Sequence, residues 1–254
     1  KNNASKIINL SWNISGNKLR NKFKFKRCEI VNDFAVLIYG IPFLKENQYS
    51  NIQKGGQTNG VNKNIHAVIG AGTGLGIARG LISKGKVQVL ASEGGHVEFS
   101  PKSKVEWELK EWLKNYLKTE RISCERIISG NGLSRIAEWR LTKPDAKNHP
   151  FQKIIKDLKI SEYSRKKIPG EICKLSNEGD SLMMEIEKIW LNAYASLIGD
   201  VAVHELCFGG LWISGGTAPK HFKNFKSDSF LKQISNKGRL IDIVKSIPIN
   251  VILD

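Results

Sequence analysis

Runs of apolar residues separated by glycine and polar positions predict several short strands in the first half of the chain. Residues 67–70 form an apolar run, and apolar residues also dominate 77–83 and 87–90. Short runs of this kind, bounded by turn residues, are typical of buried strands. Lys84-Gly85-Lys86 has the composition of a tight turn, so the last two runs are predicted to pair as a hairpin. Further strands are predicted at 29–31, within 209–216, and at 247–253.

The second half of the chain shows apolar residues at helical spacing instead. In 105–117 they recur every three or four residues, and in 182–205 this period continues over a longer stretch. Each pattern predicts an amphipathic helix whose apolar face packs on a core. Shorter helices are predicted at 14–23 and at 34–41, where Pro42 ends the second one. A loop rich in Asn, Gly and Gln and a polar helical insert are predicted at 51–64 and 142–178, respectively.

The composition is that of a soluble globular protein with an excess of positive charge. The 254 residues suffice for one large domain or two modest ones, and 41% of them are hydrophobic. No apolar run approaches the roughly 20 residues that cross a bilayer, and no signal peptide is visible. The net charge of +16 raises the question of a nucleic-acid partner. However, the lysines are dispersed, arginine is scarce and no nucleic-acid-binding motif is present, so we expect no such partner and relate the lysines to an AT-rich genome.

The four cysteines indicate a reducing compartment. Cys28, Cys124, Cys173 and Cys207 are far apart and form no C-x-x-C pair, so the sequence signals neither a zinc site nor a disulfide framework. Buried cysteines usually pack as small apolar side chains. We therefore expect reduced thiols, a cytoplasmic location and no metal bound by side chains.

A glycine-rich segment, Gly70 to Gly76, begins at the end of the apolar run 67–70. Glycines after a strand let several backbone N–H groups point at one anion, and the hydroxyl of Thr73 can bond a phosphate oxygen. The segment is not a P-loop, because no Gly-Lys-Ser/Thr follows, and it lacks the G-x-G-x-x-G spacing of a dinucleotide fingerprint. Taken alone, it is equally consistent with the bend of a hairpin.

A second glycine-bearing segment, Glu93-Gly94-Gly95-His96, carries groups suited to a polyol. Its glycines permit a close approach of ligand to backbone, Glu93 can accept protons from two hydroxyls, and His96 can donate or accept. The simpler interpretation is a surface turn with a solvated Glu and a packed His.

A candidate for proton transfer precedes both glycine segments. Phosphoryl transfer to an alcohol needs a carboxylate that takes the hydroxyl proton. Asp33 follows the strand predicted at 29–31 and is the candidate base. Asn32 and Asp33 are also suitable helix caps, so this interpretation stays open.

Several segments together, in their order along the chain, resemble the bacterial ATP-dependent glucokinases of the hexokinase/actin-like superfamily. The resemblance covers nearly the whole chain outside 142–178. It is carried by Glu29-Ile30-Val31-Asn32-Asp33-Phe34, Gly70 to Gly76, Glu93 to Val97, Ser123 to Arg126, Ser129-Gly130, and Gly209-Gly210 through Gly215-Gly216. It implies an α/β fold of the ribonuclease H-like (actin-like ATPase) type, with two domains and a sugar cleft between them. The implied division is an incomplete small α/β domain at 1–43, a large domain at 44–246 and a strand at 247–254 that returns to the small domain.

The resemblance also implies roles for individual residues. Asp33 would be the general base on the 6-hydroxyl of glucose, which receives the γ-phosphate of ATP at the entry to glycolysis. Glucose would be bound by Asn32, Gly74, Glu93, His96 and Glu125. ATP, accompanied by Mg²⁺, would be bound by Gly70, Gly72, Thr73, Gly74, Gly209, Gly210, Gly215 and Gly216. Glucose and ATP are the expected partners, and a homodimer is compatible with the family.

Two parts of the family pattern are not found in this sequence: the Asp-x-Gly-Gly-Thr-Asn phosphate motif and a final glycine-bearing loop and helix. The sequence is therefore expected to be a fragment, or a product without the N-terminal third and the C-terminal tail, and this fragment could be inactive. Two alternatives stay open: a sugar-binding remnant or regulator derived from a kinase, and a kinase for another hexose such as those of the ROK group. The absence of a cysteine cluster after His96 argues against the ROK group.

Overall fold

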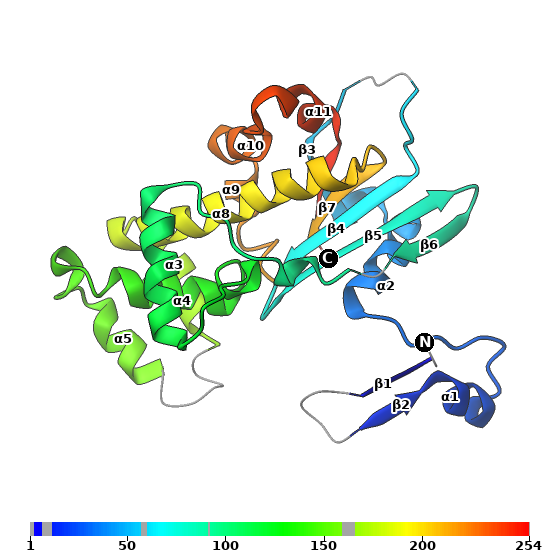
Figure 1. Ribbon diagram of the computed structural model, residues 1–254, viewed down its shortest axis with the longest axis horizontal. Coiled ribbons are helices and arrows are strands. Elements are labelled where there is room, and N and C mark those ends of the chain that lie inside the picture. Colours follow the sequence, from blue (N-terminus) through cyan, green and yellow to red (C-terminus); the bar gives the residue numbers. More distant parts are fainter. Residues whose placement is uncertain (1–2, 7–11, 57–59, 91, 159–165, 254) are drawn as a thin grey trace.

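A six-stranded mixed sheet forms the centre of the molecule (Figure 1). The computed structural model describes residues 3–6, 12–56, 60–90, 92–158 and 166–253. The strand order is β3-β8-β7-β4-β5-β6, with β4, β7 and β8 parallel to one another and the other three antiparallel to their neighbours. The strand bounds are Tyr49–Gln53 (β3), Ile65–Ala71 (β4), Leu75–Ser83 (β5), Lys86–Leu90 (β6), Gly210–Ser214 (β7) and Ile249–Ile252 (β8).

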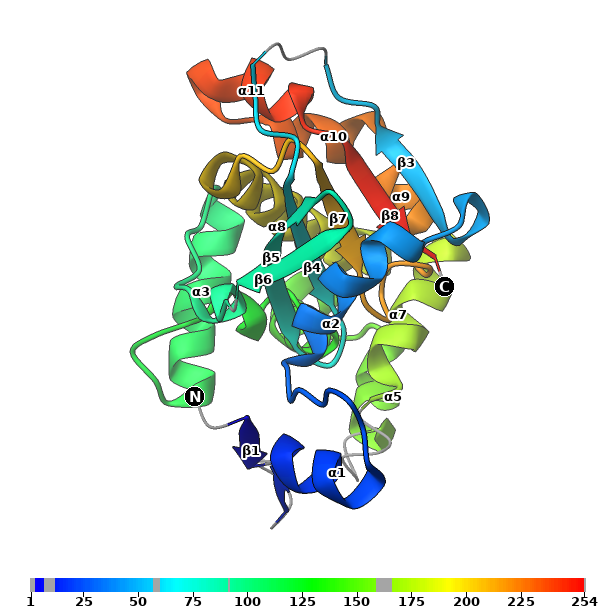
Figure 2. The ribbon, with the colours of Figure 1, turned by 90° about the vertical axis from the view of Figure 1, so that its right-hand side faces the viewer.

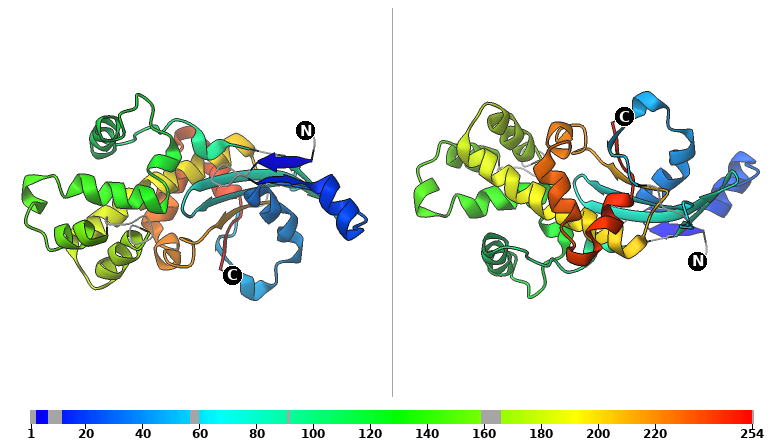
Figure 3. Two further views of the ribbon diagram at one scale, coloured as in Figure 1. Left: turned by 90° about the horizontal axis from the view of Figure 1, so that it is seen from below. Right: turned by 90° about the horizontal axis from the view of Figure 1, so that it is seen from above.

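Both faces of this sheet are covered, which explains the continuous apolar runs of its inner strands. In β4, Ala67 and Ile69 belong to a large core, whereas Val68 belongs to a smaller core on the opposite face. Successive side chains of a strand point to opposite faces, so an uninterrupted apolar run serves both cores. The large core includes the long helix α8 (Ser181–Glu205), and the smaller core includes α2 (Asp33–Gly40), which lies to one side of the sheet in Figure 3.

Four of the described helices in the second half pack directly against α8, and the helical part of the molecule extends beyond one end of the sheet (Figure 1). Segments 105–117 and 182–205 are helical, as predicted. Among the described residues, the α-helices that follow β6, besides α8, are α3 (Lys104–Leu117), α4 (Gly130–Arg140), α5 (Phe151–Leu158), α7 (Ile168–Asn177), α9 (Phe222–Phe225), α10 (Asp228–Ser235) and α11 (Ile241–Ser246). The 3₁₀ helices are η1 (Ile41–Phe43), η2 (Glu46–Gln48), η3 (Gly94–His96), η4 (Cys124–Arg126), η5 (Pro144–Ala146) and η6 (Gly238–Leu240). Within the described residues, no helix combines the length and apolar character needed to span a membrane.

The N-terminal residues form a small unit at the lower edge of the molecule in Figure 2. Strands β1 (Ala4–Lys6) and β2 (Asn13–Ser15) pair antiparallel, and helix α1 (Gly16–Phe23) follows them. Helix α2 lies outside this unit, because Ile38 and Ile41 are buried against Val68 and Ala78 of the central sheet. Strand β8 lies between β3 and β7 in the same sheet rather than in a separate small domain. Residues on both sides of positions 43 and 247 thus share the smaller core, and the division into domains stays a prediction.

Two secondary-structure predictions differ from the structure. Residues 29–31 form no strand; the backbone N–H of Ile30 donates to the side-chain oxygen of Asn3 at 2.7 Å instead. The loop predicted at 51–64 begins within β3, which is a polar edge strand. Asn51 in β3 donates to the side-chain oxygen of Asn250 in β8 at 3.0 Å. A polar strand whose pairing comes from so distant a partner has no apolar period to reveal it.

The helical insert predicted at 142–178 is part of the core rather than an appendage. Ile168 and Ile172 on α7 are fully buried, and α7 packs against α8 and α4. Phe151 on α5 is fully buried as well. The sequence did not predict these contacts, because each short helix presents only two or three apolar residues to the core and its periodicity is therefore weak.

The β4–β5 hairpin carries two glycines whose missing side chains make room for an aromatic ring. Gly70 in β4 pairs with Gly76 in β5. A Cβ atom at Gly76 would lie 1.9 Å from Cδ2 of Phe34, and one at Gly70 would lie 2.7 Å from Cε1 of the same ring. Both distances are far shorter than a van der Waals contact. The Phe34 ring therefore seats the first turn of α2 on the hairpin, directly beside Asp33.

We predict that Gly76→Ala lowers the free energy of unfolding by about 1–3 kcal/mol, because the added methyl group displaces the Phe34 ring. Denaturant unfolding of both chains measures the difference. Gly72→Ala is the matched control in the same hairpin, since a Cβ there meets no atom within 4 Å. We expect this control to stay within about 0.5 kcal/mol of the parent chain. If both variants lose the same free energy of unfolding, the position of the Phe34 ring does not depend on the space that Gly76 leaves free.

Candidate active site

A cavity of about 410 Å³ opens where the turn of the β4–β5 hairpin meets the start of α2. The segment 92–96 and the 3₁₀ helix η4 contribute to its walls. The lining residues are Asn32, Asp33, Phe34, Gly72, Thr73, Gly74, Leu75, Gly76, Ile77, Ser92, Glu93, Gly95, His96, Glu125 and Gly215. The structure thus brings together every residue that the sequence assigned to proton transfer or to a sugar: Asn32, Asp33, Gly74, Glu93, His96 and Glu125.

Asn32 and Asp33 reach this first cavity from the N-terminus of α2. The side-chain oxygen of Asn32 accepts hydrogen bonds from the backbone N–H groups of Phe34 at 2.9 Å and Ala35 at 3.3 Å, so Asn32 is the N-cap. Its amide nitrogen is then the group that can donate to a ligand. Asp33 is the first helical residue and its side chain is exposed at the cavity. Asp33 therefore follows a cap rather than the predicted strand, and the helix N-terminus stabilises its negative charge.

His96 ends the tight turn η3, Glu93 immediately precedes it, and the turn packs against the hairpin. A Cβ atom at Gly95 would lie 2.0 Å from the carbonyl oxygen of Leu75, so only glycine fits at this position. The turn places Nε2 of His96 at 3.8 Å from Oε2 of Glu93, and both side chains remain exposed. The guanidinium of Arg121 donates to the carbonyl oxygen of His96. Close packing of the backbone is therefore the local reason for Gly95, and it presents both functional side chains at the cavity.

Glu125 reaches the first cavity from η4 and is attached to the hairpin. Its Oε2 accepts a hydrogen bond from the backbone N–H of Leu75 at 3.2 Å. A Cβ atom at Gly74 would lie 2.7 Å from the same oxygen. Gly74 therefore makes room for the carboxylate, and Oε1 of Glu125 is left as the acceptor for a ligand.

The first cavity is negatively charged. Asp33, Glu93 and Glu125 contribute three carboxylates, and no lysine or arginine lines it within the described part of the chain. Carboxylates accept hydrogen bonds from hydroxyl groups, whereas they repel phosphate. The lining therefore favours a neutral polyhydroxylated ligand.

A second cavity, of about 200 Å³, adjoins the first at the turn of the hairpin, because Gly72 and Thr73 line both. Two lysines line it, and among the described residues no carboxylate does. A lining of this charge favours an anionic ligand such as a phosphate chain. The lining residues are Gly72, Thr73, Gly130, Asn131, Lys166, Pro169, Gly216, Thr217 and Lys220.

Backbone hydrogen bonds fix the turn between the two cavities. The N–H of Gly72 donates to the carbonyl oxygen of Gly74, and the N–H of Gly130 donates to that of Gly72, both at 2.8 Å. The hydroxyl of Thr217 donates to the carbonyl oxygen of Ala71 at 2.7 Å. Because a Cβ at Gly72 would meet no atom within 4 Å, open space lies beside this backbone.

The glycines that the sequence assigned to nucleotide binding separate into two groups. Gly72, Thr73, Gly74, Gly215 and Gly216 line at least one cavity. Gly215 has a φ of +91°, which favours glycine, and it directs the chain past the hairpin after β7. The second group, Gly70, Gly209 and Gly210, lines neither cavity.

Gly209 and Gly210 lie at the opposite end of β7 from the turn. Gly210 pairs with His66 at the start of β4, so about 15 Å of strand separates it from Gly215. A Cβ at Gly209 would lie 2.3 Å from the carbonyl oxygen of Lys63. A Cβ at Gly70 would collide with the Phe34 ring and the Ser214 backbone, and Gly210 has a φ of +142°, so each of the three positions has a local reason to be glycine.

The second cavity also contains side chains that the sequence analysis did not identify. Thr217 directly follows the glycine pair 215–216 and Lys220 lies four residues after it, so this pair is the one signal that could have revealed them. Lys166 comes from the segment predicted as an insert, and Asn131 comes from the first turn of α4. Nothing local marks these two, because they reach the cavity only through the packing of α7 and α4 on α8.

Comparisons of this chain with known protein families, sequences and structures agree with one another. A family model described as Glucokinase matches residues 1–254. A glucokinase of Synechocystis sp. is 33% identical over 261 residues, which cover 99% of this chain and 72% of the relative. The crystal structure of a glucokinase from an Antarctic psychrotroph has a TM-score of 0.77 at 24% identity, covering 100% of this chain and 73% of that one.

A more distant structure shares the fold as well. The ROK family glucokinase from Streptomyces griseus in complex with glucose and AMPPNP has a TM-score of 0.53 at 14% identity, covering 91% of this chain and 70% of that one. Together these similarities confirm the predicted α/β architecture of the actin-like ATPase type.

We predict that Lys220→Met weakens the binding of inorganic tripolyphosphate to the chain about tenfold, because a charged hydrogen-bond donor of the second cavity is lost. Isothermal titration calorimetry measures the dissociation constant. Lys223→Met is the matched control, since Lys223 is exposed on α9 and lines neither cavity. If both variants lose the same affinity for tripolyphosphate, the effect comes from the net charge of the protein, and Lys220 is not part of the site.

Proposed function

Since this chain belongs to the glucokinase family, we propose that it transfers the γ-phosphoryl group of ATP to the 6-hydroxyl of glucose. The observation that carries the proposal is the charge of the two adjoining cavities. One hairpin turn, at Gly72 and Thr73, borders both a cavity with three carboxylates and a cavity with two lysines. A sugar hydroxyl and a terminal phosphate can meet at this turn, each in surroundings of suitable charge.

On the sugar side, the proposed ligands are the side chains of the first cavity. The carboxylates of Glu93 and Glu125 accept hydrogen bonds from hydroxyls, His96 accepts or donates one, and the amide of Asn32 donates one. Four such contacts from separate elements fix the orientation of a rigid ring. Orientation matters here because phosphoryl transfer depends mainly on positioning and on electrostatic stabilisation.

Asp33 is the proposed general base. Its carboxylate takes the proton of the 6-hydroxyl as the oxygen of that hydroxyl attacks the γ-phosphorus atom, and ADP leaves with the broken bond's electrons. The Asp33 side chain is exposed at the cavity; its Oδ1 accepts the backbone N–H of Phe34 at 3.0 Å, and its Oδ2 is left available to substrate. The neighbouring Phe34 ring holds the helix start, so the base is placed on a rigid element.

On the nucleotide side, the turn 72–74 and Lys220 are proposed to receive the phosphates. Thr73 contributes a hydroxyl at the border of the cavities, and Lys220 contributes a positive charge on the side away from the sugar. Such a charge stabilises the developing negative charge on the leaving ADP.

Magnesium is part of the proposed substrate, MgATP, rather than of a protein site. Mg²⁺ prefers carboxylate, phosphate and water oxygens. The described lining of the second cavity has no carboxylate, so the residues present do not form a magnesium site by themselves. The ion would be held by phosphate oxygens and water.

Glucose phosphorylation is favoured over the alternatives of a sugar-binding remnant, a regulator or a kinase for another hexose, because both the family and the curated relative are glucokinases. We also propose a role at the entry to glycolysis, a cytoplasmic location, a homodimer, and neither nucleic acid nor membrane as partner. The four cysteines are free thiols, which supports a reducing compartment.

We predict that Asp33→Asn lowers kcat by about 10²–10⁴-fold, because the base that accepts the hydroxyl proton is lost. The dissociation constant for glucose stays within about twofold, since other side chains hold the sugar. A coupled assay of ADP formation, run with glucose and a panel of other hexoses, measures turnover, and calorimetry measures glucose binding. Near-normal turnover in the variant would remove Asp33 from the mechanism.

Asp228→Asn is the matched control, because Asp228 is also the first residue of a capped helix, α10, and lines neither cavity. It removes a negative charge from a helix N-terminus without touching the site, so kcat should be unchanged. Glucose binding by the parent chain without any hexose-dependent ADP formation would contradict the proposed function and favour a sugar-binding remnant.

A further inference from the structure

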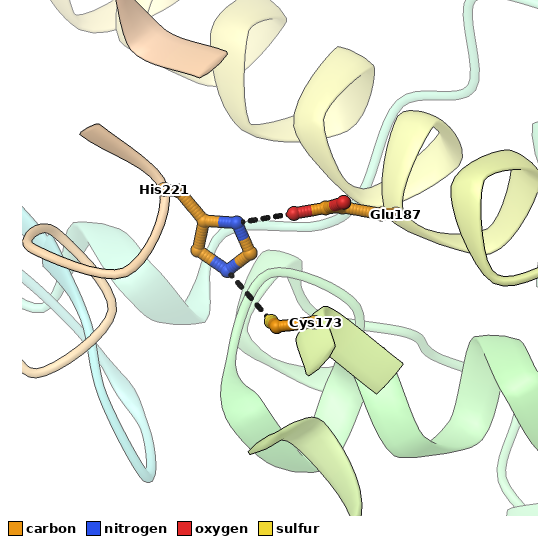
Figure 4. Close-up of side chains that lie close together, drawn as sticks. All are labelled: Cys173, Glu187 and His221. Atoms are coloured by element: carbon orange, nitrogen blue, oxygen red, sulfur yellow. Dashed lines mark hydrogen bonds and ion pairs between the residues drawn. The ribbon is translucent and has the colours of Figure 1, made fainter. Parts of the chain in front are cut away.

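A buried polar cluster lies between the helices of the second half of the chain. His221, Glu187 and Cys173 are 1%, 7% and 9% exposed. Nδ1 of His221 lies 2.7 Å from Oε1 of Glu187, and Nε2 lies 3.7 Å from Sγ of Cys173. Figure 4 shows the imidazole between the carboxylate and the thiol. Three polar side chains from three elements are thus joined in a chain of hydrogen bonds.

One ligand atom each of Cys173, Glu187 and His221 lies within 4.8 Å of the other two, a spacing that a metal ion could also use. The contacts present in the structure are those of a hydrogen-bond relay, because the two ring nitrogens of His221 face different partners (Figure 4). Burial raises the pKa of the Cys173 thiol to about 11, which keeps it protonated and able to donate to Nε2. The histidine then donates its Nδ1–H to Glu187.

Glu187 is the charged centre of this cluster. Its carboxylate accepts hydrogen bonds from His221, from Nδ2 of Asn224 at 2.9 Å and from Oγ of Ser176 at 2.5 Å. Burial alone would raise the pKa of Glu187, but these donors outweigh burial and hold the pKa below its usual value. A buried charge with this many donors fixes every segment that supplies one, because losing a donor leaves the charge partly unpaired.

Two of those segments also form walls of the second cavity. His221 directly follows Lys220 and the stretch 216–217, and Cys173 lies one helical turn after Pro169 on α7. The relay therefore ties the Gly216–Lys220 wall and the Pro169 wall to helix α8, which carries Glu187.

A neighbouring aromatic residue on α8 ties down the third wall. Trp190 stacks on the His221 ring with centroids 4.8 Å apart. Its indole Nε1–H donates at 3.2 Å to the carbonyl oxygen of Ser129, the N-cap of α4. The next two residues, Gly130 and Asn131, line the second cavity. One turn of α8, from Glu187 to Trp190, thus contacts all three helical or loop walls.

We infer that Glu187, His221, Cys173 and Trp190 are positioning residues for the nucleotide. They fix the shape of the second cavity by holding its three walls on α8. The inference rests on the proposed function, since that function makes the second cavity the place of the phosphates. None of the four residues lines either cavity, so each acts through the segments that it holds. Their loss should weaken nucleotide binding while leaving sugar binding intact.

The test compares Glu187→Gln with the parent chain. Glutamine keeps the size but carries an NH₂ group that opposes one of the three donors, so we expect the dissociation constant for AMPPNP to rise about tenfold. Calorimetry should give a glucose dissociation constant within about twofold of the parent. Hydrogen exchange should quicken at 129–132 and 215–221 but not at 93–96. Glu185→Gln is the matched control on the same helix, since Glu185 is half exposed and pairs with Arg140.

A second pair of variants applies if Glu187→Gln folds poorly. Cys173→Ser retains a donor to His221 and should bind AMPPNP as the parent does, whereas Cys173→Val removes the donor and should weaken AMPPNP binding about threefold. Unchanged AMPPNP affinity in Glu187→Gln and Cys173→Val, or equal losses of AMPPNP and glucose affinity, overturns the inference and leaves the proposed function intact. If the parent chain binds one equivalent of zinc and Cys173→Val does not, the cluster is a metal site, and this result also overturns the inference. A parent chain that binds AMPPNP but phosphorylates no hexose overturns the proposed function instead.

Discussion

The packing of one aromatic ring into a gap between two strands determines where the chemistry of this protein lies. Phe34 occupies the space that Gly70 and Gly76 leave free on the β4–β5 hairpin, and neither position can carry a side chain without displacing the ring. The contact joins the start of α2 to the hairpin whose turn borders both cavities. The carboxylate of Asp33 and the backbone of the turn are therefore parts of one rigid body. An enzyme that works mainly by positioning needs a connection of this kind.

Sequence patterns predicted the inner part of the fold well, because buried strands and long amphipathic helices carry their own periodicity. The runs at 67–70 and 77–83 and the helices at 105–117 and 182–205 are all present. Strand β3 was missed, since its polar residues are held by pairing with β8 rather than by burial. The sequence did not show that helix α7 belongs to the core, because α7 has few apolar residues, although Ile168 and Ile172 are completely buried.

The candidate site follows the same division between local and long-range information. A short stretch of sequence is enough to identify Glu93, His96 and Asp33, because each lies next to glycines or a helix cap. Gly209 and Gly210 look like Gly215 and Gly216 in sequence, yet only the second pair lies at the turn, because the direction of β7 decides which end meets the cavities. The relay beneath the second cavity has no motif at all, since its members come from α7, α8 and the segment before α9.

The position of β8 bears on how the protein reaches this structure. Its neighbours in the sheet are β7 and β3. Helices α9, α10 and α11 lie between β7 and β8 in the chain, whereas nearly 200 residues separate β3 from β8, as the Asn51–Asn250 contact shows. β3 has β8 as its sheet neighbour, so it cannot pair until β8 has been synthesised. Contacts of such long range are slow to form, and the edge of β7 stays open until then. During synthesis the growing chain therefore carries an unpaired strand edge, and such an edge can pair with other chains until β8 covers it.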